Sequence, residues 1–389
     1  MKDLKIAISG YGSVSALGIG QEQTWNSYLE ERHYFKRKQF DFSEEWVAAL
    51  APEALGAIEE IKKDKKYLPL DPSVHYAIAA SRLAIKNAGW NKDEELGINI
   101  GSSRGATETF EKYHAEFIGN GLKQVNPLTS PSTTLGNISS WVATDLTVNG
   151  PVISHSATCS TALQSVANAA AWLQAGFSKR FIAGGSEAPL SAFTIAQMKA
   201  LKIYSGLSDD FPCRSMDPHK KQNTLILGEA AACFCLELSS NHADAYITGI
   251  GYGTERISHG ASLSEDAFCI QKSMKMAIEG HDPGSIDVVI MHSPGTLLGD
   301  SSELKALDLV FGKNRPLITG NKWKIGHTFG ASGALSLEMA LLMLKHNHFI
   351  QIPYLPVQQQ KRKLKKVLIN AAGFGGTAFS ILIENSDQN

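Results

Sequence analysis

The pattern of apolar and polar positions predicts an α/β protein. Short apolar runs end at glycine-containing turns, and stretches with helical periodicity follow them along most of the chain. The clearest such unit spans residues 150–176. We predict a short buried strand at residues 152–156 (VISHS), followed by an Ala- and Leu-rich helix that begins at Ser160. Because this helix is apolar on nearly every face, we expect it to lie at the centre of the molecule.

The same order of predicted elements occurs twice along the chain. A strand, a helix, a strand, a helix and a strand are predicted in the first half at residues 6–12, 76–89, 97–103, 159–173 and 180–185. The second half repeats this order at residues 245–253, 267–280, 287–293, 330–344 and 366–376. Such a match indicates a tandem duplication of one β/α unit. We therefore predict two halves, residues 1–240 and 241–389, with a boundary near residues 239–244.

Composition and charge exclude several classes of protein. The 37 Lys and Arg residues nearly balance the 38 Asp and Glu residues, so no global field points to nucleic acid or to a membrane surface. The five cysteines are an odd number without metal-ligand spacing, which is typical of a reducing compartment. No run of 18 apolar residues and no secretory leader are recognisable. We expect a cytoplasmic protein.

Cys159 is the first candidate for chemistry. It stands where the predicted strand meets the central helix, and the first turn of a helix offers free N–H groups and the positive end of the helix dipole. Both stabilise a thiolate, which is the nucleophilic form of cysteine. The alternative is that Cys159 is a small buried apolar residue, as most free cysteines are.

The second half supplies the partners that this cysteine would need. In a duplicated β/α protein, the carboxyl ends of matching strands meet at one shared site. His292 follows the predicted strand at 287–293, His327 precedes the helix at 330–344, and Lys322 lies five residues before His327. Two histidines that face a cysteine suit nucleophilic thiol chemistry with donors for a developing oxyanion. Each histidine could instead be a structural imidazole.

Four blocks of sequence at these positions resemble the β-ketoacyl-acyl-carrier-protein synthases, the condensing enzymes of thiolase fold. They are GPVISHSATCSTAL around Cys159, DVVIMHSPGTLLGDSSELKAL from His292, NKWKIGHTFGASGA around Lys322 and His327, and NAAGFGGTA near the end. The resemblance covers nearly the whole chain. It implies a thiolase-like fold with duplicated βαβαβαββ halves in an α-β-α-β-α arrangement of layers.

The resemblance also implies a reaction. Cys159 would take an acyl group from the phosphopantetheine arm of an acyl carrier protein, and the N–H groups of Cys159 and Phe374 would form the oxyanion hole. Malonyl carrier protein would then lose carbon dioxide, and His292 and His327 would stabilise the enolate that attacks the acyl-cysteine. The product would be two carbons longer. The implied activity is that of an acyltransferase in fatty-acid synthesis or in specialised polyketide or aryl-polyene-type lipid synthesis.

Supporting residues and partners follow from the same resemblance. Lys322, with Asp300 and Glu303, would orient the histidines and balance their charge. No metal and no cofactor are expected, since the phosphopantetheine arrives on the carrier protein. Besides this carrier protein, the expected partner is a second ketosynthase-like subunit that pairs through residues 152–157. The homodimer and the heterodimer both remain open, and neither nucleic acid nor a membrane is expected.

The chain departs from the usual family motifs around the catalytic residues. The usual His-Gly-Thr-Ser-Thr reads His-Ser-Pro-Gly-Thr here, so Thr296 keeps the place of a hydroxyl that contacts pantetheine. The usual Phe-Gly-Phe-Gly-Gly is Ala-Gly-Phe-Gly-Gly, so Ala372 replaces one of two gate aromatics and Phe374 is the other. The segment 214–229 is about two residues longer than usual. These changes favour a specialised pathway and a pocket that admits a bulkier primer. The alternative is that side chains from the long loop at 119–136 fill the space that the missing aromatic ring at position 372 leaves.

Two other functions compete with an active condensing enzyme. A thiolase that uses coenzyme A generally carries a second active-site cysteine in the last motif, and the corresponding residues here, NAAGFGGT, contain none. A non-elongating chain-length partner of a ketosynthase typically lacks the nucleophile, whereas Cys159 is present. The sequence therefore favours the condensing enzyme.

Overall fold

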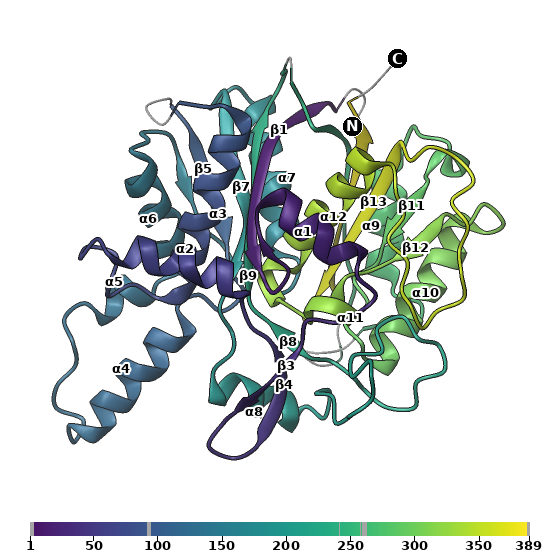
Figure 1. The fold of residues 1–389 in the computed structure, drawn as a ribbon. Coiled ribbons are helices and arrows are strands. Elements are labelled where there is room, and N and C mark those ends of the chain that lie inside the picture. Colours follow the sequence, from purple (N-terminus) through teal and green to yellow (C-terminus); the bar gives the residue numbers. More distant parts are fainter. Residues whose placement is uncertain (1–3, 92–94, 241, 257, 259–262, 387–389) are drawn as a thin grey trace.

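A computed structural model describes residues 4–91, 95–240, 242–256, 258 and 263–386, and it confirms the predicted duplication (Figure 1). The first half contributes the strands β1 (Ile6–Ser15), β5 (Gly97–Gly101), β6 (Val152–Ile153), β7 (Arg180–Glu187) and β9 (Ala230–Glu237). The second half contributes β10 (Ala245–Thr254), β11 (Val288–Ile290), β12 (Leu317–Thr319), β13 (Lys366–Gly373) and β14 (Thr377–Asn385).

The two sets of strands have the same order. The first is β6-β5-β7-β9-β1 and the second is β12-β11-β13-β14-β10. In each set the first three strands are parallel to one another, and the next two pairings are antiparallel. The sets join where Ile6–Ile8 pair with Ala245–Ile247, so they form one continuous sheet among the described residues. The division at residue 240 stays a prediction.

Two central helices separate the half-sheets. Residues of α7 (Thr161–Gln174) and α12 (Ser332–His346) share one apolar core with β1, β9, β13 and β14. The outer face of the first half-sheet packs on α3 (Pro72–Ala88) and α6 (Asn137–Leu146), and α9 (Phe268–Ala277) and α10 (Leu297–Phe311) lie beyond the second. The layers are therefore α-β-α-β-α, as the resemblance implied.

The remaining elements lie outside the duplicated set of strands and helices. A small sheet consists of β3 (Lys36–Gln39), β4 (Glu44–Ala48) and β8 (Leu227–Gly228), while β2 (Gly18–Ile19) pairs with β1. The helices are α1 (Gly20–Leu29), α2 (Pro52–Lys62), α4 (Thr107–Gly119), α5 (Thr129–Thr133), α8 (Ala192–Ala200) and α11 (Lys322–Ile325), with short 3₁₀ turns η1 (Pro283–Ser285) and η2 (Phe329–Ala331). Figure 1 shows α4 projecting from the body. Within the described residues, no helix combines the length and apolarity that crossing a bilayer requires.

Helix α3 shows how local sequence sets an element. Pro72 occupies its first turn, where the missing N–H is not needed, and the Asp71 side chain accepts a hydrogen bond from the Ser73 N–H (2.9 Å). Gly89 ends the helix with a φ of 65°, a left-handed conformation that glycine adopts without strain. The helix predicted at 76–89 is therefore present, and it begins four residues earlier, at Pro72.

One predicted strand was wrong in length and burial. Strand β6 contains only Val152 and Ile153, and the Val152 side chain is 43% exposed. It is an edge strand, bonded on one side to β5, and its other side has no neighbouring strand among the described residues. The predicted loop at 119–136 also contains α5, a single short helical turn.

A carboxyl group lies inside the central layer. Glu338 of α12 is fully buried, and Ser13 donates a hydrogen bond to one of its oxygens (2.5 Å). Burial raises the pKa of Glu338 from 4.5 to about 7. Because the folded state favours the neutral carboxyl group, protonation of Glu338 contributes to the free energy of unfolding, and this contribution is fully present below about pH 4.5. It is lost as the pH rises through about 7.

We predict that Glu338→Gln stabilises the protein more at about pH 8 than at about pH 5, by about 1–3 kcal/mol, because the amide cannot ionise. Chemical unfolding of both proteins at the two pH values measures this difference. Glu116→Gln on the exposed surface of α4 is the matched control and should show no such pH dependence. Equal effects of the two substitutions would contradict an ionising Glu338 in the core.

Candidate active site

One cavity brings together most of the predicted site residues. Its volume is about 360 Å³, and it is lined by residues of both halves. The predicted residues that line it are Cys159, His292, Thr296, Glu303, His327, Ala372 and Phe374. Lys322 and Asp300 are fully buried behind this lining. The structure thus places the cysteine of the first half and the histidines of the second half at a shared site.

A strained turn presents Cys159. Thr158 has a φ of 51°, in the left-handed region that non-glycine residues rarely adopt, and α7 begins at Thr161. Gly373 lies directly against this turn: a Cβ on Gly373 would be 1.8 Å from Thr158 Oγ1 and 3.2 Å from the Cys159 nitrogen. Only glycine fits there. Thr158 Oγ1 also donates to the Phe374 carbonyl oxygen (3.2 Å), which fixes this turn beside Cys159.

Burial controls the protonation of Cys159. It raises the pKa of the thiol to about 12, whereas the Lys322 charge and the N–H groups of Cys159 and Phe374 act in the opposite direction. The sequence led us to expect a thiolate stabilised by the helix start. The stabilising groups are present, but desolvation outweighs them, so the resting cysteine is a neutral thiol. A nearby base must therefore accept its proton during nucleophilic attack.

The two histidines are suited to this exchange of protons. Their ring centroids are 5.1 Å apart and the rings are nearly perpendicular. Burial first, and then the charge of Lys322, lowers the pKa of both His292 and His327 well below 6.5. At neutral pH each ring is therefore neutral, with one N–H donor and one acceptor nitrogen. Neither Nδ1 atom has a hydrogen-bond partner among the described residues.

Glu303 holds the backbone at His292 and not the imidazole. Its carboxylate accepts the N–H groups of His292 (2.9 Å) and Ser293 (2.7 Å) and the side-chain amide of Asn370 (3.1 Å). Lys322 is fully buried, and burial lowers its pKa to about 8, opposed chiefly by the charge of Glu303. Glu303 therefore positions His292 through its main chain. Lys322 supplies positive charge near both Glu303 and Cys159.

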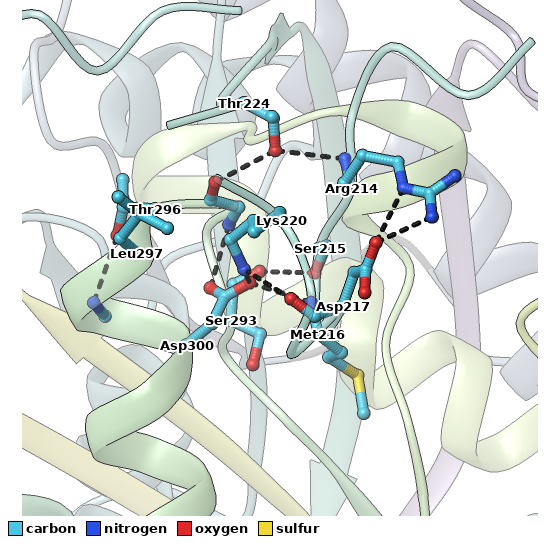
Figure 2. A network of polar contacts seen from close by, with 12 residues as sticks. Arg214, Ser215, Met216, Asp217, Lys220, Thr224, Ser293, Thr296, Leu297 and Asp300 are labelled. Atoms are coloured by element: carbon cyan, nitrogen blue, oxygen red, sulfur yellow. Dashed lines mark hydrogen bonds and ion pairs between the residues drawn. The ribbon is translucent and has the colours of Figure 1, made fainter. Parts of the chain in front are cut away.

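Asp300 was expected to orient the histidines and balance their charge together with Lys322 and Glu303. Its carboxylate accepts the N–H groups of Met216 (2.7 Å) and Gly295 (3.0 Å) and pairs with Lys220 Nζ (2.6 Å). The contacts are drawn in Figure 2. Lys220 was missed in the sequence, where it is one of two adjacent lysines in the unusual segment 214–229. Asp300 is thus an anchor between this segment and the loop after His292.

Further hydrogen bonds fasten the segment to the same loop. Ser215 Oγ donates to the Ser293 carbonyl oxygen (2.7 Å), and both the N–H and the hydroxyl of Thr224 donate to the Gly295 carbonyl oxygen (2.9 Å each; Figure 2). The end of the segment holds His327 as well, because the His327 N–H donates to the Ile226 carbonyl oxygen (2.7 Å). One segment therefore positions the main chain at both histidines.

The predicted pantetheine and gate residues lie at the cavity wall. Thr296 caps α10, accepting the Gly299 N–H on its hydroxyl oxygen (3.2 Å), and its O–H can still donate to a ligand. Phe374 is 42% exposed, whereas Ala372 is buried. Leu263 and Ile270 line the cavity together with Ala372. None of the residues that line it comes from the loop at 119–136.

The described residues contain no cluster of three or more His, Cys, Asp or Glu side chains arranged for a metal ion. The arrangement instead offers a nucleophilic thiol, two neutral imidazoles, a buried ammonium group and two backbone donors. Such a set can form a thioester on Cys159 and stabilise negative charge on oxygen.

Comparisons with known families agree with this description. The model of the beta-ketoacyl synthase N-terminal domain matches residues 3–242, and that of the beta-ketoacyl synthase C-terminal domain matches residues 245–353. A 3-oxoacyl-[acyl-carrier-protein] synthase 2 of Rhizobium meliloti (strain 1021) is 27% identical, over 97% of this chain and 98% of the relative. A synthase of the same name from Staphylococcus aureus (strain MRSA252) is 26% identical, over 96% and 97%.

Solved structures show the same fold. A beta-ketoacyl synthase from Burkholderia phymatum STM815 superimposes with a TM-score of 0.87 at 24% identity, covering 98% of this chain and all of that one. A chain of the complex between a type II polyketide acyl carrier protein and its hexaketide-bound ketosynthase superimposes with a TM-score of 0.85 at 19% identity, over 99% and 100%.

We predict that Lys220→Met destabilises the protein by about 3–5 kcal/mol, because it leaves the Asp300 charge buried without its cation. Loosening the loop after His292 should also speed alkylation of Cys159 by iodoacetamide. Unfolding curves and alkylation rates measure the two effects. Lys221→Met, which removes an exposed neighbouring charge, is the control and should change neither. Equal stability of the two variants would show that the Lys220–Asp300 pair does not hold this loop.

Proposed function

Because the chain belongs to the beta-ketoacyl synthase family, we propose that it extends an acyl chain by decarboxylative Claisen condensation with malonyl-[acyl-carrier protein]. Proteins of this family are acyltransferases, and the homologous synthases match nearly the full length of the chain. The observation that carries the proposal is the shared cavity, in which Cys159 of the first half meets His292 and His327 of the second.

In the loading step, the Cys159 sulfur attacks the thioester of an acyl carrier protein. A neutral imidazole of His292 or His327 accepts the thiol proton, and the proton leaves on the pantetheine sulfur. The N–H groups of Cys159 and Phe374 both lower the pKa of the thiol, and in this proposal they donate to the oxyanion that forms on the thioester carbonyl. Gly373 makes this geometry possible because it lets residue 374 approach the nucleophile.

In the condensation step, malonyl carrier protein loses carbon dioxide and forms an enolate. Ring N–H groups of His292 and His327 donate to the enolate oxygen, while the carbon attacks the acyl-cysteine carbonyl. The tetrahedral intermediate collapses, the Cys159 thiolate leaves and takes up a proton, and the β-ketoacyl chain stays on the carrier. Lys322 holds positive charge beside the thiolate as it leaves.

The finer assignments are also part of the proposal. Thr296 contacts the pantetheine arm, Phe374 acts as a gate, and no cofactor is used besides the pantetheine of the carrier. The five free cysteines support a cytoplasmic location. The cavity around Ala372 supports a specialised lipid or polyketide pathway, in which the primer is bulkier than a straight saturated chain.

The second partner in the proposal is another ketosynthase-like subunit. In the part of the chain that the structure describes, one edge of strand β6 pairs with no other strand, and Val152 on it is 43% exposed. The projecting α4 and the residues after it expose a group of apolar side chains on the same half: Phe110, Ile118, Leu122, Val125 and Leu128. These features support pairing through the edge at residues 152–157, with either an identical or a related chain.

Cys159→Ala should abolish acyl loading without unfolding the protein, because alanine fits the start of a helix. His292→Ala and His327→Ala should each slow condensation by ~100- to 1000-fold while slowing loading much less, because decarboxylation needs both donors to the enolate. Single-turnover assays separate the steps, with intact mass for loading and β-ketoacyl carrier protein for condensation. Acylation of the Cys159→Ala variant at another residue, or equal loss of both steps in the histidine variants, would contradict the assigned roles.

We expect a dimer at micromolar concentration, detectable by sedimentation. Val152→Asp should shift it to monomer, because a charge on an edge strand prevents strands from pairing edge to edge. Val357→Asp makes the same change at a side chain that is 82% exposed, and should leave the dimer intact. A wild-type protein that sediments only as a monomer would refute the proposed pairing.

A further inference from the structure

Arg104 lies next to the candidate active site and has no role in the steps above. It follows β5, and its guanidinium carbon is 5.7 Å from the ring centroid of Phe329. Phe329 lines the cavity, and its ring packs against His327 at a centroid distance of 5.4 Å. Arg104 Nη2 donates to the side chain of Gln197. The next residue along the chain, Met198, lines the cavity. A positive charge therefore lies one aromatic ring away from the catalytic imidazole.

The backbone around Arg104 is held by a buried carboxylate. Glu187, at the end of β7, is fully buried and accepts the N–H groups of Ser103 (2.8 Å), Arg104 (3.1 Å) and Gly330 (2.8 Å). Arg104 and the residue after Phe329 therefore share one anchor. The guanidinium is therefore preorganised: its position beside the cavity is fixed before a ligand binds, as a binding residue requires.

The guanidinium is incompletely satisfied where it lies. The Nε atom of Arg104 is buried and has no acceptor among the described residues. The ion pairs found among these residues do not include Arg104 either. The apolar cluster that contains Cys159 and Phe329 also contains Leu190, Ile195 and Met198 of the neighbouring segment. Arginine stays charged at any physiological pH, and a buried donor without an acceptor is costly. An oxygen atom supplied by a ligand would remove this cost.

We infer that Arg104 determines acyl specificity by donating to an oxygen in the tail of the acyl group that Cys159 carries. The substrate class is then an acyl chain with a keto, hydroxyl or carboxylate oxygen beyond the thioester, and not a plain hydrocarbon chain. This inference rests on the proposed condensing function. A hydrocarbon tail near Phe329 would desolvate the guanidinium further without giving it an acceptor.

The test compares loading of Cys159 from carrier proteins that bear octanoyl, 3-oxooctanoyl, 5-oxooctanoyl or 7-oxooctanoyl groups, followed by intact mass. We expect the wild-type protein to load at least one oxo chain about 10- to 100-fold faster than octanoyl, the effect of one charge-assisted hydrogen bond. Arg104→Met should remove this preference. Arg104→Lys, which keeps the charge but not the planar fork, should retain part of it.

Lys272→Met on the exposed face of α9 removes the same charge far from Phe329 and should keep the full preference. The preference is the ratio of the loading rates of an oxo chain and of octanoyl on the same carrier protein. A substitution that changes how strongly the carrier protein binds affects both rates equally and leaves this ratio unchanged. A wild-type protein without a preference for any oxo chain, or an Arg104→Met variant that keeps the preference, would overturn the inference. Failure of every carrier to acylate Cys159 would instead refute the proposed function.

Discussion

The close contact between Gly373 and the turn at Thr158 is the constraint on which the site depends. It brings the end of β13, from one half, against the turn that carries Cys159 in the other half, with no room for a side chain at position 373. The N–H groups of Cys159 and Phe374 can both lower the pKa of the Cys159 thiol only because the main chains of these two segments are in contact. The duplicated fold makes this contact possible, since it brings the end of β13 in the second half to the turn after β6 in the first half.

Burial is the second physical factor, and it sets every charge in the cavity. Desolvation raises the pKa of Cys159 and lowers the pKa values of Lys322 and both histidines. The groups are thus mostly neutral or close to their titration range at neutral pH, where protons move between them at low cost. A more open site would leave the imidazoles partly protonated and less able to accept the thiol proton.

The unusual segment 214–229 shows how the chain keeps His292 and His327 in place despite changed motifs. Lys220 and Asp300 form a buried pair, and Ser215 and Thr224 bond to the loop after His292. The segment includes β8, and the carbonyl oxygen of Ile226, the residue just before β8, accepts the His327 N–H. Its extra length therefore does not separate it from the site. It holds the main chain at both histidines with an ion pair and hydrogen bonds of its own.

The sequence by itself determined the duplication and the order of strands and helices, and it singled out Cys159, His292 and His327 as candidates, because these depend on local periodicity and on motifs that are contiguous in the chain. The tertiary structure decided what depends on segments far apart in sequence. The protonation of Cys159 follows from burial by both halves, Glu303 bonds to the main chain at His292, and Asp300 pairs with Lys220. Arg104 likewise gained significance only when folding brought it to Phe329, because a single arginine carries no pattern that distinguishes it from a surface charge.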